Sequence, residues 1–192
     1  MGCLFVLILV DNLINYNCMK DKIFCFKFRN RRGVIYLETS EEYDPEMLFT
    51  GKIKNNEVFK ARISKGTTYC PYCYLPDPYN LGISEKFRSD LIENGVTGWG
   101  NYTIEIANCN FKYYGLQILG TKVMLKRPAT TGSVRGMELD MSGWDGSDIF
   151  AASGMFQIFF TPKVRNILLT SKMLCPEEIV DISELEWYSA AL

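Results

Sequence analysis

The sequence predicts an α+β fold with a mostly antiparallel sheet and two main helices, all in a single domain of 192 residues. Many short segments are apolar or alternate between apolar and polar residues, and turn residues bound them, which is typical of antiparallel strands. Few helical stretches lie between these segments. Apolar residues make up 47% of the chain, which is enough for a core.

We divide this domain into three parts. Residues 1–64 form a β-rich half, residues 65–82 an ordered loop rich in proline and tyrosine, and residues 83–192 an α+β half. Three prolines between residues 65 and 81 exclude a helix through the loop. Its four tyrosines would be costly to expose, so we expect it to be ordered and to join the two halves.

The N-terminal half predicts strands and little else. Leu4–Val10 is an apolar run that suits a buried strand; it is too short to span a membrane and lacks the flanks of a targeting segment. Residues 22–30 alternate in polarity and predict a strand, with Val34–Leu37 as its hairpin partner. The acidic stretch Glu41–Asp44, which ends at a proline, predicts a loop, and Val58–Ile63 another strand.

The C-terminal half contains both predicted helices. Ser84 is a helix cap, and the helix it begins ends near Asn94. Thr161 followed by proline predicts the second helix, because a cap residue before proline is a strong start signal. The remaining apolar segments predict strands over residues 102–106, 113–119, 122–126, 156–160 and 179–187.

The two helical stretches align with each other without gaps. ISEKFRSDLIENGVTGW and FTPKVRNILLTSKMLCP share a cap, a lysine, an arginine and a leucine at matching positions, and an apolar strand follows each. One explanation is a duplicated helix–strand unit. The other is that two ordinary amphipathic helices have converged on the same pattern, and the sequence leaves both open.

Composition excludes several classes of function. The formal net charge is −1, whereas a non-specific nucleic-acid binder needs a basic surface, so we expect no nucleic-acid partner. The chain has no histidine, which excludes hydrolysis through a Ser-His or Cys-His pair. Carboxylate or lysine chemistry stays open. We expect no cofactor and no membrane association.

Seven cysteines do not form the dense framework of a small secreted domain, so we expect a cytoplasmic protein with free thiols. Cys70 and Cys73 lie in CPYC, the redox motif of glutaredoxin-like proteins, but the prolines that follow forbid the helix on which that chemistry depends. The two cysteines could also supply half of the four ligands that a structural zinc site needs. A second CxxC and any histidine are missing, so we predict that these thiols hold no essential metal and perform no turnover.

Three aspartates gather in the stretch from Gly136 to Phe150. Asp145 and Asp148 suggest a divalent cation site or an acid/base pair, but Asp and Gly around a tryptophan are also what a tight, well-packed loop needs. The loop explanation is the favoured one. An enzyme would need both carboxylates in a deep pocket with perturbed pKa values.

Three segments together carry a family likeness: ISEKFRSDLIENGVTGW, then YYGLQILG, then LDMSGWDGSDIF ahead of IFFTPKV. They resemble the immunity-type proteins of bacterial polymorphic toxin systems. The likeness covers about residues 83 to 187. Some members of that family carry paired CxxC motifs, whereas this chain has one, which puts an inherited metal site in doubt.

The resemblance implies a small cytoplasmic, non-catalytic protein that binds and neutralises a cognate protein toxin. The residues that could contact the toxin, or else structure the loop, are Trp99, Trp144, Asp145, Asp148 and Phe150. For Trp144 a role in pinning its own loop is slightly favoured over direct contact. The alternative function is a carboxylate-dependent hydrolase or transferase that uses Asp145 and Asp148.

Overall fold

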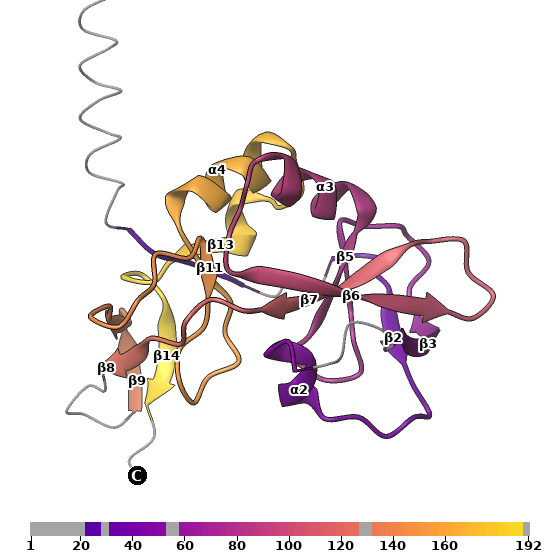
Figure 1. Cartoon of the computed structure of the whole chain (residues 1–192), viewed down its shortest axis with the longest axis horizontal. Coiled ribbons are helices and arrows are strands. Elements are labelled where there is room, and N and C mark those ends of the chain that lie inside the picture. The colour runs from indigo at the N-terminus through magenta and orange to yellow at the C-terminus, as the bar shows by residue number, and fades with distance from the viewer. Residues whose placement is uncertain (1–21, 28–30, 53–57, 127–131, 190–192) are drawn as a thin grey trace, which may run out of the picture.

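The computed structural model describes residues 22–27, 31–52, 58–126 and 132–189. It confirms the α+β class, the mostly antiparallel pairing and the two main helices. The predicted strand over Leu4–Val10 lies outside the described residues. In Figure 1 a barrel lies to one side, the strands of the C-terminal region lie to the other, and the two main helices lie together along the top.

Six strands close into a barrel. Their order around it is β2 (Tyr36–Glu38), β3 (Val58–Lys65), β6 (Trp99–Ile106), β7 (Tyr113–Ile118), β5 (Leu81–Ser84) and β4 (Tyr72–Tyr74). The β3–β6 and β2–β4 pairs are parallel and the others antiparallel. Along β6 the buried and exposed residues alternate from Asn101 to Ile106, as expected for a strand with one face in a core.

Two features of the barrel differ from the sequence predictions. The expected loop over residues 65–82 contributes β4 and the start of β5, so it is a wall of the barrel rather than a connection between halves. Its prolines lie outside these strands, where they remove no ladder hydrogen bond. The predicted hairpin is also wrong, because β2 pairs with β3 and β4.

The strand expected to pair with β2 belongs to a second sheet. β1 (Phe24–Phe26) lies between β12 (Phe159–Phe160) and β13 (Ile179–Asp181), and β11 (Ile149–Phe150) pairs with the far side of β12. All three residues of β1 are buried, so the strand needs partners on both edges. The C-terminal region supplies both of them.

Two short ribbons complete the strands. One pairs β8 (Met124–Lys126) with β10 (Glu138–Asp140), and the other pairs β9 (Gly132–Arg135) with β14 (Glu186–Ser189). The single strand expected over residues 179–187 is therefore two strands, β13 and β14. Ser183 lies in the turn that separates them, where its N–H and hydroxyl donate to Asp181.

The two main helices begin at the predicted caps. In α3 (Glu85–Glu93) the N–H of Phe87 donates to Ser84 Oγ at 3.2 Å. In α4 (Pro162–Thr170) the Thr161 hydroxyl instead donates to Asp148. The helices pack against each other, and a buried strand precedes each of them. The strands that follow them belong to different sheets, and duplication stays a hypothesis.

A third helix was not predicted. α2 (Pro45–Phe49) begins directly after Glu41–Asp44, the stretch expected to be a loop, because Asp44 accepts hydrogen bonds from the N–H groups of Glu46 and Met47. Phe49 then packs edge-on against Phe156 at 5.6 Å between ring centroids. A further 3₁₀ turn, η1, spans Pro176–Glu178. Among the described helices, none is long and apolar enough to cross a membrane.

A buried carboxylate connects the barrel to the second sheet. Glu178 is 1% exposed; it forms a two-point ion pair with Arg31 and accepts bonds from the Tyr72 hydroxyl at 2.6 Å and from the Cys175 N–H at 2.8 Å. The Arg31 guanidinium also lies over the Tyr72 ring. The network joins the segment before β2, strand β4 and the C-terminal region.

One glycine is required by packing inside the barrel. Gly115 on β7 pairs with Tyr102 on β6, and a Cβ at Gly115 would overlap the Tyr102 ring. The tyrosine ring therefore fills the space that a side chain on β7 would otherwise occupy. Such close packing of a ring against a backbone tolerates little increase in side-chain volume.

We expect Gly115→Ala to destabilise the fold by about 3 kcal/mol, because the tyrosine ring must leave its position. Gly143→Ala is the matched control, since a Cβ there meets no atom within 4 Å, and we expect it to change stability by less than about 0.5 kcal/mol. Denaturant unfolding of both variants measures this. Equal stabilities would show that Tyr102 is not held against Gly115.

We expect Glu178→Gln to cost about 3 kcal/mol, because it leaves the Arg31 guanidinium without its counter-charge. Burial raises the pKa of Glu178, but the bonds from Arg31, Cys175 and Tyr72 outweigh it and hold the pKa below its ordinary value. A lowered folded-state pKa stabilises the fold above the ordinary pKa of a glutamate, and this stability is lost as pH falls through the lowered value.

Unfolding curves between pH 7 and pH 3 measure that loss. The Glu178→Gln variant should lose less stability over this range than the wild-type protein does. The exposed Glu184 supplies a control, Glu184→Gln, which should follow the wild-type curve. A wild-type curve parallel to that of Glu178→Gln would contradict the role given to this carboxylate.

Candidate partner-binding surface

The loop that ends at β11 is fastened by Asp148. One carboxylate oxygen accepts bonds from the Thr97 N–H at 3.0 Å, the Thr97 hydroxyl at 3.2 Å and Lys163 Nζ at 2.8 Å. The other accepts from the Thr161 hydroxyl. Lys163 also donates to the carbonyl of Gly95. Asp148 thus joins the turn after α3 to the start of α4.

The charge state of Asp148 suits this structural role. Burial raises its pKa, but the hydrogen bonds from Lys163 and Thr97, with the charge of Lys163, bring the pKa below its ordinary value. The carboxylate is therefore ionised near neutral pH. A general acid needs the opposite shift, so that it keeps its proton near neutral pH.

Asp145 has a separate set of partners. Its carboxylate accepts bonds from the N–H and hydroxyl of Ser147 and from the N–H of Thr121. Those hydrogen bonds, with Ser147 contributing most, hold its pKa well below the ordinary value. Asp145 and Asp148 share no hydrogen-bond partner within the described residues, and each is a fixed acceptor that organises the backbone. The pattern is that of an Asx-type loop.

The predicted aromatic residues pack inward. Phe150 is fully buried, and the half-buried Trp144 lies against it with 5.5 Å between ring centroids. Trp99 is also half-buried, and its indole N–H donates to the Val96 carbonyl at 2.9 Å. This packing supports a loop-structuring role for Trp144 and Phe150. Contact between any of these residues and a partner stays a prediction.

The two cysteines of CPYC lie inside the molecule. Cys73 is on β4 with no exposed surface, and burial raises the pKa of its thiol far above the ordinary value. Cys70 is also buried, and its backbone exchanges hydrogen bonds with the Tyr113 hydroxyl. Among the described residues, no three cysteine, aspartate or glutamate side chains are placed to hold a metal ion. The lack of an essential metal stays a prediction.

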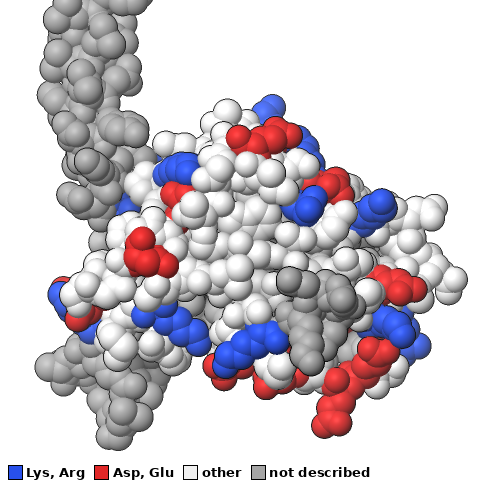
Figure 2. Space-filling model, in the orientation of Figure 1, with Lys and Arg blue, Asp and Glu red and all other residues white. Residues whose placement is uncertain are grey.

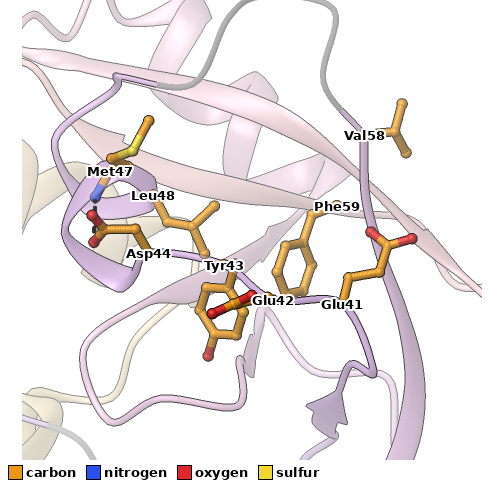
Figure 3. Close-up of a pocket in the computed structure, with 8 residues that line it drawn as sticks. All are labelled: Glu41, Glu42, Tyr43, Asp44, Met47, Leu48, Val58 and Phe59. Carbon is orange, nitrogen blue, oxygen red and sulfur yellow. Dashed lines mark hydrogen bonds between the residues drawn. The ribbon is translucent and has the colours of Figure 1, made fainter.

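A pocket opens between α2 and β3, and Figure 3 shows its lining. Its volume is about 360 Å³. One wall comes from the segment that leads into α2 and from the helix itself, and the other comes from the start of β3. Its lining residues are Glu41, Glu42, Tyr43, Asp44, Met47, Leu48, Val58 and Phe59.

The floor of this pocket is apolar and rigid. Leu48 and Phe59 are buried, and Tyr43 meets Phe59 edge-on with 5.3 Å between ring centroids. The Tyr43 hydroxyl donates to Asp77 at 3.2 Å, which fixes the ring. Asn80 ties the base of α2 to the barrel by donating to the Pro45 carbonyl at 3.0 Å.

The rim of the pocket is acidic and exposed. Glu42 has no hydrogen-bond or ion-pair partner among the described residues. Glu41 has one weak ion pair, at 3.8 Å to the exposed Lys60, and Asp44 uses one oxygen to cap α2. Met47 and Val58 add exposed apolar surface beside these carboxylates. In Figure 2, acidic side chains lie along the lower edge, on the side where α2 lies in Figure 1, and basic side chains lie beside them.

Sequence reasoning missed this pocket. An aspartate followed by proline precedes α2, which is the same type of start signal that identified α4. That signal could have revealed the helix. The pocket itself depends on the pairing of β2 with β3, which brings both walls together across the chain.

Two further pockets contain neither Asp145 nor Asp148. One is a small apolar space between the barrel and the helices, with about 30 Å³ of free volume. The other lies between the two ribbons, where Lys126, Arg135, Glu138 and Trp187 are among its lining residues. The Trp187 indole is already bonded to the Gly136 carbonyl at 2.8 Å.

No family model matches the chain, and no curated protein matches its sequence.

We expect Asp148→Asn to destabilise the fold by about 2 kcal/mol, because the Lys163 ammonium loses its counter-charge and the Asn amide can replace only part of the hydrogen bonds. The exposed Glu93 provides a control, Glu93→Gln, which should change stability by less than about 0.5 kcal/mol. Thermal unfolding measures both variants. A stability equal to wild type would mean that the Asp148 contacts contribute nothing net.

Proposed function

We propose that this protein is a non-catalytic binding module that neutralises a cognate bacterial protein toxin by forming a stoichiometric complex with it. The family likeness supplies the class of partner. The observation that carries the proposal is the open pocket between α2 and β3, with a fixed apolar floor and a rim of exposed carboxylates.

A pocket of this kind suits recognition of another protein. Binding energy at protein interfaces is concentrated where an anchor side chain enters a well-packed pocket and charged residues surround it. Charges at the rim raise the association rate and select the partner. The pocket between α2 and β3 combines these features, and its floor is held by the Tyr43–Asp77 and Asn80–Pro45 bonds described above.

The aspartates of the WDGSD loop fit this function as supports. Asp148 fastens the turn after α3 to the start of α4, and Asp145 shapes its own loop. Rigid partners lose less conformational entropy on binding, so a well-fastened scaffold favours tight association. A toxin inhibitor needs such affinity, because even a small free fraction of toxin remains active.

Co-expression with the neighbouring toxin reading frame tests this function. We expect the chain to restore growth of cells that produce the toxin, and the two proteins to co-purify at a ratio of one to one. Toxin in excess should raise the melting temperature of the chain, because binding only to the folded state stabilises it. The proposal fails if no such toxin is encoded nearby, or if the pair neither restores growth nor co-purifies.

A further inference from the structure

We propose that the pocket between α2 and β3 takes a lysine or arginine side chain of the partner protein. This inference deepens the proposed function and rests on it for the statement that the occupant belongs to a protein. The size, the lining and the charge of the pocket each favour this occupant.

The size fits one long side chain. A volume of about 360 Å³ lies at the lower end of the range for small-ligand pockets, which is about 300–1,000 Å³. The pocket is open to solvent, so a side chain can enter it while its backbone stays outside. A whole helix or strand of a partner would not fit within this volume.

The apolar lining matches the stem of such a side chain. Lysine and arginine bury their methylene groups along apolar surface and keep the charged group at a polar rim. Phe59, Leu48 and Met47 offer this surface, and the ring of Tyr43 adds an aromatic wall. A cation near an aromatic ring also gains from the negative face of that ring.

The charge selects a cation. Three lining residues carry carboxylates, and none of the lining residues carries a positive charge. Among the rim carboxylates, Glu41 pairs with the exposed Lys60 at 3.8 Å, and the neighbouring Lys122 is paired with Glu46 of α2 at 3.6 Å. Glu42 has no partner among the described residues, and one oxygen of Asp44 is left over after it caps α2.

A metal ion is not the cation that these carboxylates suit. Among the described residues, no group of three acidic or thiol ligands converges closely enough to hold one. Separated carboxylates above an aromatic floor suit an organic cation, whose charge is spread over several atoms and whose stem is apolar. An anionic or neutral anchor would leave the rim charges without a partner and meet repulsion or desolvation.

The first test uses small cations as probes of the purified chain. Butylammonium and ethylguanidinium reproduce the ends of lysine and arginine, and butanol is the uncharged control. We expect both cations to shift the backbone amide resonances of Met47, Leu48, Val58 and Phe59, and butanol to shift them much less. Equal shifts with butanol, or shifts that map to another surface, would overturn the inference.

The second test removes the rim charges. Glu41→Gln together with Glu42→Gln leaves Asp44 to cap α2, so the helix stays intact. Each lost carboxylate should weaken cation binding about two- to fivefold, as expected for exposed ion pairs. Glu138→Gln, in the pocket between the ribbons, is the matched control and should leave binding unchanged. Unchanged cation binding in the double variant would contradict the inference.

The toxin itself separates this inference from the proposed function. If the wild-type chain binds the toxin and the double variant associates at least fivefold more slowly at low salt, both stand. If the wild-type chain and the double variant bind the toxin equally well, the proposed function stands, but the pocket is not where the toxin binds. If the wild-type chain does not bind the toxin, the proposed function fails, and the inference fails with it.

Discussion

A carboxylate with almost no contact with water holds together three parts of the chain that are far apart in sequence. Glu178 accepts bonds from Arg31, from Tyr72 and from the backbone of Cys175, and these partners lie before β2, on β4 and at the entrance to η1. Burying such a pair costs desolvation energy, and we infer that its contribution is to select one arrangement of the barrel and the second sheet. The Glu178 contacts therefore fix the position of the barrel strands relative to the C-terminal strands.

The pocket is a consequence of strand pairing within the barrel. β2 leads directly into the acidic segment, and β3 supplies the opposite wall because it is the antiparallel neighbour of β2. In the WDGSD loop, by contrast, Asp148 and Asp145 accept hydrogen bonds from nearby backbone and side-chain groups of the protein itself. The acidic groups near the WDGSD loop are therefore committed to structure, whereas Glu42 is available to a partner. This contrast between committed and available charge is the basis for placing recognition at the pocket.

Local sequence signals predicted individual helices, but they did not predict which strands pair. The caps Ser84 and Thr161 identified both main helices, because a capping side chain acts within one turn. The pairing of β1 with β12 and β13 could not be predicted, because the sequence of a short buried strand does not indicate which distant strands pair with its edges. The same limit hid the barrel role of residues 72–74 and the pocket, whose walls meet only after β2 and β3 pair. The sequence singled out Asp145 and Asp148 as candidates for a tight loop or for partner binding, whereas their individual hydrogen-bond partners depend on tertiary contacts.

Hydrogen–deuterium exchange of the chain with and without the toxin would locate the contact surface. We expect the toxin to slow exchange in residues 41–48 and 58–59, the two walls of the pocket, and the loop over residues 144–150 to exchange at the same rate as in the free chain. Toxin-induced protection confined to residues 144–150 or to α3 and α4, with residues 41–48 and 58–59 unchanged, would contradict this expectation.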